Sequence, residues 1–415
     1  MTPGHGRDGD GMLTIGGMRA DVIAERYGTP VLVLDLAVFD RALHDIQSAA
    51  HAHGVHVSYA AKALMLTALA RRLQRSGAGV DVASLGELVT AERGGIDAAR
   101  ITLHGAGKTD EEIEAAFLGR VGRIAVDSLD ELRRIVARSQ GRVLDLILRL
   151  NTGIEAHTHE FIRTAGDDSK FGIAPHEEPE AFTLLRSSPQ LRLRGVHAHI
   201  GSQIFDAIPY EANAALLVDA IVRCRDASFR EADTIVIGGG FGVQMHPESP
   251  DQRVDVAAVL ARAAAAVPKG IHLEIEPGRA IVAAAGTSLY RVMAIKRYAK
   301  RTFVIVDGSI ADNPRPALYG AYHHVVPARL STQGDHAVTV SGRSCENDAL
   351  ADTALPRDLQ AGDLLAFCTT GAYTYSMAST YNRFARPPVV AIENESAELW
   401  ARRESIDDIL RNDVT

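Results

Sequence analysis

Short apolar runs alternate with longer amphipathic stretches between about residue 55 and residue 275 of this 415-residue chain. The short runs are continuously apolar, which is typical of parallel strands covered by helices. The longer runs have the apolar spacing of helices with one buried face. We therefore expect strands at residues 55–61, 80–84, 100–104, 123–126, 143–150, 193–200, 234–237 and 271–275.

The helices expected between these strands have recognisable start signals. Thr109 is followed three residues later by Glu112, which predicts a capping box. Ser128 precedes an apolar-periodic run and predicts a helix N-cap. The expected helices cover residues 64–75, 85–94, 109–118, 129–139, 177–186, 210–227 and 254–266.

Eight such β/α units predict a TIM (β/α)8 barrel, which we place at residues 37–285. An open, doubly wound α/β sheet is the alternative fold. After residue 286 helical pattern is scarce, which predicts a mostly β domain at 286–415. Residues 1–36 contain the strand-like run 31–34 and are expected to join this domain. Its expected strands are 289–297, 302–307, 337–342, 363–370 and 389–393.

Composition excludes several classes of protein. A formal net charge of −8 gives no basic field for nucleic acid or a membrane surface. No apolar run approaches the ~20 residues of a membrane span, and residues 1–12 lack the apolar core of a secretory signal. Three widely spaced cysteines argue against a disulfide framework or a zinc ribbon, so a cytoplasmic location is expected.

The residues with chemical potential fall at the ends of predicted strands. Lys62 follows the first strand, and His199 ends the sixth. Three glycines at 238–240 end the seventh strand, and Glu-Pro-Gly-Arg at 276–279 ends the eighth. A barrel brings all these positions to one mouth, where such enzymes carry their active sites.

Each position allows two interpretations. Lys62 is either a surface lysine or an amine that forms a Schiff base, its reactivity raised by desolvation. The glycines form either a tight turn or a backbone cradle for phosphate. Glu276 at a pyridine nitrogen would keep that nitrogen protonated, which makes the ring the electron sink that decarboxylation needs.

The remaining candidates are less specific. His197 and His199 share one strand face and could bind a metal, but no further ligands with credible spacing accompany them, and we expect none. His199 could instead stack on an aromatic cofactor or be a hydrogen-bonded core residue. Cys345 could be a small buried apolar residue beside an acid.

A series of ordered motifs identifies the family that this chain resembles, the fold-type III decarboxylases that depend on pyridoxal phosphate, and most closely the diaminopimelate decarboxylases. The resemblance covers about residues 28–411. The motifs are Tyr-Ala-Ala-Lys-Ala at 59–63, Val-Asp-Val-Ala-Ser-Leu-Gly-Glu-Leu at 80–88, Ala-His-Thr-His at 156–159, Ser-Lys-Phe-Gly at 169–172, His-Ile-Gly-Ser-Gln at 199–203, Gly-Gly-Gly-Phe-Gly at 238–242, Glu-Pro-Gly-Arg at 276–279, Asp-Asn-Pro-Arg-Pro-Ala-Leu-Tyr at 312–319, Cys-Glu at 345–346 and Gly-Ala-Tyr at 371–373.

The resemblance implies pyridoxal 5′-phosphate as cofactor and a homodimer with shared active sites. It implies that Lys62 holds the cofactor as a Schiff base and that Cys345 donates a proton in a neighbouring subunit's site. The implied catalytic residues are Lys62, Cys345, Glu276 and His199. The implied cofactor-binding residues are Lys62, His199, Ser202, Gly239, Gly240, Glu276, Pro277, Gly278, Arg279 and Tyr373, and the substrate-binding residues are Arg279, Arg315, Tyr319, Glu346 and Tyr373.

The implied substrate is meso-2,6-diaminopimelate, which is converted to L-lysine and CO₂. Arg279 and Arg315 with Tyr319 suit its distal carboxylate, and Glu346 suits its distal ammonium group. The loop at 345–349 is one residue shorter than is usual in the family, which permits another carboxylated amino acid in a specialised pathway. A non-catalytic relative is a further alternative. An alanine-racemase-like activity is disfavoured, because that chemistry avoids a carboxylate at the pyridine nitrogen.

Overall fold

The computed structural model describes residues 2–154, 170–246 and 254–414, which form parts of two compact units. The barrel unit comprises His44–Gly242 and Arg253–Gly278. The β unit comprises Met1–Leu43, Val243–Gln252 and Arg279–Thr415. The predicted motif at 156–159 and the first residue of the motif at 169–172 lie outside the described residues.

Eight parallel strands form a closed ring in the barrel unit. Pairing between the last and the first of these strands closes the ring, so the predicted barrel is confirmed and the open sheet is wrong. Each expected strand overlaps one observed strand. In order around the ring they are β5 (His56–Ala60), β6 (Gly79–Val82), β7 (Ile101–Leu103), β8 (Arg123–Val126), β9 (Leu144–Arg149), β10 (Leu191–His197), β11 (Thr234–Val236) and β12 (His272–Ile275).

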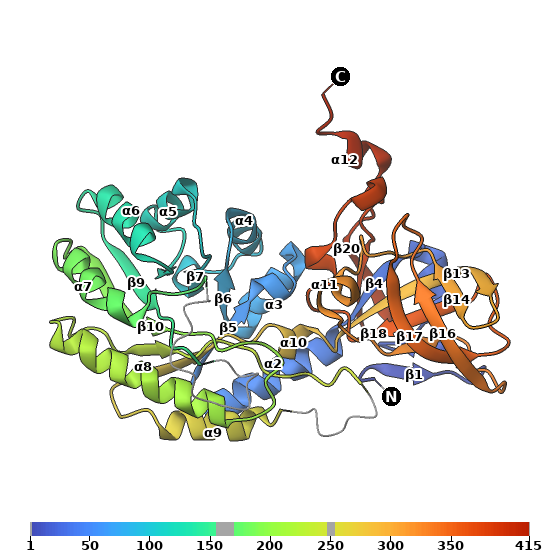
Figure 1. Ribbon diagram of the computed structural model, residues 1–415, viewed down its shortest axis with the longest axis horizontal. Helices are drawn as coiled ribbons and strands as arrows, with labels where there is room; N and C mark the ends of the chain where they lie inside the picture. Colours follow the sequence, from blue (N-terminus) through green and yellow to red (C-terminus); the bar gives the residue numbers. More distant parts are fainter. Residues whose placement is uncertain (1, 155–169, 247–253, 415) are drawn as a thin grey trace. The chain divides into compact units, whose positions relative to one another are not determined.

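Helices lie outside the strands of the barrel unit (Figure 1). Both predicted start signals are confirmed: Thr109 and Glu112 form a capping box, and the Ser128 side chain accepts a hydrogen bond from the Glu131 N–H. The helices are α3 (Thr67–Ser76), α4 (Leu85–Arg93), α5 (Asp110–Phe117), α6 (Leu129–Ser139), α7 (Glu178–Arg186), α8 (Ile208–Asp226) and α9 (Val256–Ala265). A long helix that the pattern did not predict, α2 (Leu36–His51), precedes β5.

The β unit is built on a nine-stranded sheet. Its strand β4 (Val31–Asp35) comes from the N-terminal region and pairs with two strands from the C-terminal region, β13 and β19. The other strands of the sheet are β13 (Gly286–Arg297), β14 (Thr302–Val306), β15 (Val325–Pro327), β16 (Asp335–Ser341), β17 (Ala349–Pro356), β18 (Leu364–Cys368), β19 (Val389–Glu393) and β20 (Ser396–Ala401). The sequence pattern missed β15, β17 and β20.

A smaller three-stranded sheet and four short helices complete the β unit. Apolar residues of β4, β13 and β19, such as Val33, Leu289 and Val390, pack with α1 in one core cluster. The small sheet contains β1 (His5–Arg7), β2 (Leu13–Ile15) and β3 (Met18–Arg19), and the helices are α1 (Ala20–Tyr27), α10 (Arg279–Val282), α11 (Arg315–Tyr319) and α12 (Ile406–Leu410). Among the described residues, none of the helices is long and apolar enough to cross a membrane.

Candidate active site

The turns that follow β5 and β12 contact each other at the carboxyl end of the barrel. The Ala60 N–H donates a hydrogen bond to the Pro277 carbonyl, with an N···O distance of 3.1 Å. A Cβ added to Gly278 would lie 3.0 Å from Ala63 Cβ, so this glycine permits the close approach. Lys62 lies in the first turn with an exposed side chain, although both flanking alanines are buried. The expected desolvation of Lys62 is therefore not observed.

Glu276 is held between two histidines from other strand ends. His197 Nε2 lies 3.0 Å from Oε2 of Glu276, and His104 Nε2 lies 3.1 Å from Oε1. The second contact is close but poorly aligned, so Oε1 is a buried acceptor without a hydrogen-bond donor among the described residues. Burial alone would raise the pKa of Glu276, but the two imidazoles outweigh it and hold that pKa well below its ordinary value.

His199 lies beside the glycine-rich turn after β11. Its Nδ1 accepts a hydrogen bond from the Gly239 N–H at 3.3 Å. Burial and the nearby charge of Lys62 lower the pKa of His199 to about 3, so its ring is neutral at physiological pH. The charge of Lys62 also lowers the pKa of Asp81 and Glu87, against the larger upward effect of their burial. Lys62, His199 and the carboxylates thus share one electrostatic environment.

Glycine is required where the turns after β10, β11 and β12 meet. Gly238 and Gly240 have φ values of +72° and +92°, in the region that side chains disfavour. A Cβ on Gly239 would lie 2.1 Å from the Glu276 carbonyl oxygen. Ser202 is exposed on the neighbouring turn after β10. The predicted glycine turn is therefore packed directly against the turn that carries Glu276.

A cluster of cationic and aromatic side chains lies in the β unit. The Arg279 guanidinium carbon lies 4.7 Å from the ring centroid of Tyr373, and that of Arg315 lies 5.6 Å from the same centroid. Arg315 is also 5.8 Å from the ring of the exposed Tyr319. Arg315 is only 7% exposed, and burial together with the charge of Arg279 lowers its pKa to about 10. Among the described residues, no carboxylate forms an ion pair with Arg315.

His323 belongs to the same cluster, and sequence reasoning missed it. It is 1% exposed, its Nδ1 lies 3.2 Å from the Cys368 carbonyl, and its Nε2 has no hydrogen-bond partner among the described residues. Burial, and then Arg315 and Arg279, lower its pKa to about 4. The signal in the sequence was slight: a histidine four residues after the 312–319 motif.

Cys345 and Glu346 lie on the loop between β16 and β17, and both are exposed. The Cys345 N–H donates a hydrogen bond to Oδ1 of Asn382 at 3.2 Å, and the Tyr381 hydroxyl donates one to Glu346. The alternative that Cys345 is a buried apolar residue is therefore wrong. Buried thiols do occur at the other two cysteines, Cys224 and Cys368, where burial raises the pKa to about 12 and about 11.

The structure groups three potential metal ligands that the sequence did not group. One ligand atom each from His104, His197 and Glu276 lies within 4.8 Å of the others. His199, the second residue of the histidine pair noted in the sequence, is not among them. Because Nε2 of His197 is already bonded to Oε2 of Glu276, we interpret this cluster as hydrogen-bonding residues around a carboxylate.

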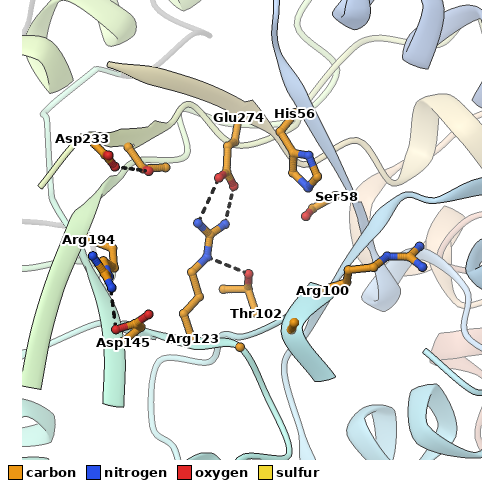
Figure 2. Close-up of a pocket in the computed structure, with 12 residues that line it drawn as sticks. His56, Ser58, Arg100, Thr102, Arg123, Asp145, Arg194, Asp233 and Glu274 are labelled. Atoms are coloured by element: carbon orange, nitrogen blue, oxygen red, sulfur yellow. Dashed lines mark hydrogen bonds and ion pairs between the residues drawn. The ribbon is translucent and has the colours of Figure 1, made fainter. Parts of the chain in front are cut away.

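A second concave region lies at the amino ends of the barrel strands, with a volume of about 360 Å³. Figure 2 shows its lining, where Arg123 makes a two-pronged contact with Glu274 and a third bond to Thr102. Arg194 is similarly paired with Asp145. Two of the three arginines that line this pocket are thus paired with carboxylates of the same lining, and this face of a TIM barrel usually serves stability. We therefore assign the active site to the opposite, carboxyl end.

Residues 36–283 match the family described as "Pyridoxal-dependent decarboxylase, pyridoxal binding domain". This match covers more than half of the chain. The chain belongs to the pyridoxal-dependent decarboxylase family. Within this family, the predicted resemblance is confirmed over almost the whole length by the relatives that follow.

Two relatives of this decarboxylase are named diaminopimelate decarboxylase. One, from Actinosynnema pretiosum subsp. auranticum, is 41% identical, with 97% of this chain and 93% of the relative covered. The other, from Bacillus subtilis, is 37% identical, with 97% and 95% covered. The structure of a diaminopimelate decarboxylase from M. jannaschii in complex with L-lysine has a TM-score of 0.90 and 29% identity, and the match covers 100% of this chain and 98% of the other.

The side chains at the carboxyl end of this decarboxylase's barrel fit a phosphorylated pyridine ring. The buried Oε1 of Glu276 is an acceptor without a donor among the described residues, as the protonated nitrogen of such a ring would require. The neutral imidazole of His199 suits contact with an aromatic face. The glycines at 238–240 carry no side chains that would keep a phosphate away from the backbone, and the Gly239 N–H already donates to His199.

Proposed function

We propose that this protein decarboxylates meso-2,6-diaminopimelate to L-lysine and CO₂, with pyridoxal 5′-phosphate held by Lys62. Near-complete coverage of relatives named diaminopimelate decarboxylase supports this reaction. The observation that carries the choice of substrate is Arg315, a buried guanidinium without an ion-pair partner among the described residues.

Two arginines in a desolvated cluster call for an anionic ligand. Arg279 and Arg315 both flank Tyr373, and the charge of each disfavours the other. A carboxylate between them would accept charge-assisted hydrogen bonds from both guanidiniums. Diaminopimelate carries a second carboxylate far from the one that is lost. Lysine and ornithine lack it and would leave the buried charge of Arg315 without a carboxylate.

The remaining residues have complementary roles. Pyridoxal phosphate, when bound, supplies a ring that takes up the electron pair left behind by CO₂. Glu276 would stabilise a proton at the ring nitrogen of the bound cofactor, and the imidazole of His199 would contact the ring. Ser202, Gly239 and Gly240 hold the phosphate group, together with the turn formed by Pro277, Gly278 and Arg279.

The exposed pair Cys345 and Glu346 serves the substrate. Cys345 supplies the proton that replaces the lost carboxylate, and Glu346 binds the distal ammonium group. Tyr319 and Tyr373 contact the distal end beside the arginines. Because Cys345 is exposed on its own chain, it is accessible to a second copy, and we propose a cytoplasmic homodimer with shared sites.

Replacement of Arg315 tests the substrate assignment. Arg315→Ala should lower diaminopimelate turnover by about a hundredfold or more, because a charge-assisted contact with the distal carboxylate is lost, whereas pyridoxal phosphate affinity changes little. Lysine release is measured by mass spectrometry, with lysine, ornithine and arginine tested as competing substrates. The control is Arg343→Ala, which removes an exposed arginine that contacts Phe384 in the same unit.

Two results would contradict the assignment. Wild-type protein that releases product from another amino acid but not from diaminopimelate would favour a specialised pathway. Equal losses of turnover and cofactor affinity in Arg315→Ala would indicate a folding defect rather than a lost substrate contact.

A further inference from the structure

Glu276 receives its two histidines from across the barrel. His197 ends β10, His104 directly follows β7, and Glu276 directly follows β12. In the ring of strands β12 pairs with β11 and β5, so neither histidine comes from a strand adjacent to β12. Their rings contact each other at 5.1 Å between centroids, with an interplanar angle of 63°. The contact between His104 and Glu276 therefore joins segments on either side of the β5–β12 pairing that closes the ring.

The two histidines engage the carboxylate unequally. His197 is fully buried and its Nδ1 has no partner among the described residues, which assigns its N–H to Nε2, facing Oε2 of Glu276. His104 Nε2 lies 3.1 Å from Oε1 and 3.8 Å from Oδ1 of Asp81. With Oε2 occupied, Oε1 is the oxygen left for a donor from outside the protein.

We propose that His197 and His104 are positioning residues, which fix the plane of the Glu276 carboxylate and direct Oε1 towards the ring nitrogen of the cofactor. This inference rests on the role of Glu276 in the proposed function. Groups that hydrogen-bond a functional side chain commonly set both its orientation and its basicity. The sequence motifs assigned neither histidine to this role.

The charges around Glu276 are consistent with this role. Burial lowers the pKa of His197 to about 4, only partly offset by Glu276, so a neutral imidazole donates to a charged carboxylate. Burial, and then the charge of Glu276, raise the pKa of Asp81, which leaves Glu276 as the anion of the pair. The other ionisable groups that face this carboxylate are Arg123, Arg149 and His199.

The experiment is an infrared titration of the carboxyl band in protein freed of cofactor, with Glu276→Gln used to assign the band. His197→Phe keeps the volume of a ring but removes the donor, and His104→Phe does the same for the second contact. His197→Gln restores an N–H close to the position of Nε2. His56→Phe, at the opposite end of the barrel, is the matched control (Figure 2).

Loss of the hydrogen bond from His197 should raise the pH at which Glu276 protonates by about one unit or more in His197→Phe, and loss of the second imidazole should raise it further in the double variant. His197→Gln and His56→Phe should stay near the wild-type value. In reconstituted enzyme, kcat should fall by about tenfold to a hundredfold in His197→Phe, with KM little changed.

An unchanged Glu276 titration in folded His197→Phe and double variants would overturn the proposal, whatever happens to turnover. Folding is checked by circular dichroism and the melting temperature. Because the titration uses protein without cofactor or substrate, it decides the positioning role even if the purified enzyme does not release lysine. Failure of the proposed function would instead appear as absent lysine release in the wild-type protein.

Discussion

Two charged side chains, one in each unit, differ in whether the surrounding protein supplies a partner. Glu276 is a buried anion that receives a hydrogen bond from His197, whereas Arg315 is a buried cation with no ion-pair partner among the described residues. A buried charge without a partner is unfavourable for folding, and it persists where a ligand completes the pairing. Because the buried charge of Arg315 has no carboxylate partner among the described residues, the cluster around it is suited to bind an anion.

His323 gives a prediction at the same scale. Its pKa is lowered to about 4, so as the pH falls the unfolded chain takes up a proton at this residue before the folded chain does. The neutral form of His323 therefore makes its full contribution to the free energy of unfolding above about pH 6.5, and this contribution is lost as the pH approaches 4. In His323→Gln this dependence should disappear, so the difference from wild type in the free energy of unfolding should shrink or reverse with acidification, by up to about 1.4 kcal/mol per pH unit.

Calorimetry between about pH 7.5 and 4.5 measures this difference. The control is His272→Gln, which replaces a largely exposed imidazole on β12. Parallel melting curves for wild type and His323→Gln across this range would rule out a neutral buried imidazole.

At the scale of elements, the turns after the strands decide the geometry of the site. The turn after β11 packs so closely against that after β12 that Gly239 has no room for a Cβ. The turn after β5, which carries Lys62, is bonded to the turn that follows Glu276. Contacts between turns therefore position Lys62 and Glu276, and the barrel strands that precede these turns support them.

Gly239→Ala tests this view of the turns. The new Cβ would lie 2.1 Å from the Glu276 carbonyl oxygen, so β11 and β12 must separate at their ends. We expect a loss of about 1–3 kcal/mol in stability and weaker binding of pyridoxal phosphate. Thermal unfolding and a spectral titration with the cofactor measure both effects.

Gly107→Ala is the matched control, because a Cβ at Gly107 would meet nothing within 4 Å. Its melting temperature and cofactor affinity should stay close to those of wild type. A Gly239→Ala variant that behaves like this control would show that the two turns do not constrain each other.

For the molecule as a whole, we propose that two copies of the chain contribute residues to each active site. Lys62 belongs to the barrel unit, and Cys345 lies exposed on a loop of the β unit. The resemblance implies that this thiol acts in a neighbouring subunit, which requires that active sites are shared between copies. Subunit mixing distinguishes a shared site from a site completed within one chain.

Inactive Lys62→Ala and Cys345→Ala proteins should restore activity when they are mixed and allowed to exchange subunits. A heterodimer then contains one site with both residues intact, so about a quarter of wild-type activity is expected at equal ratio. Exchange is followed by native mass spectrometry with one protein isotope-labelled. If heterodimers form but activity does not return, the active sites are not shared between copies. The activity of each variant alone provides the baseline.

The features of the fold that the sequence predicted are those that depend on residues close together in the chain. All eight barrel strands, the capping box at Thr109 and the N-cap at Ser128 follow from short-range patterns of burial and hydrogen bonding. The pattern missed α2 and the sheet strands β15, β17 and β20, although β17 and β20 each pair with the strand that precedes them in the chain. The pattern did predict β4, but not its partners β13 and β19, which lie more than 250 residues later in the chain.

The sequence by itself determined the family, the order of strands and helices, and which residues follow which strand. Tertiary structure alone decided that His104 and His197 meet at Glu276, because closure of the barrel brings strands together that are not neighbours. It also decided that Lys62 is exposed and that Arg315 is buried without a carboxylate partner among the described residues. Periodicity records which face of an element is buried, whereas the partner of a buried charge depends on how distant segments pack.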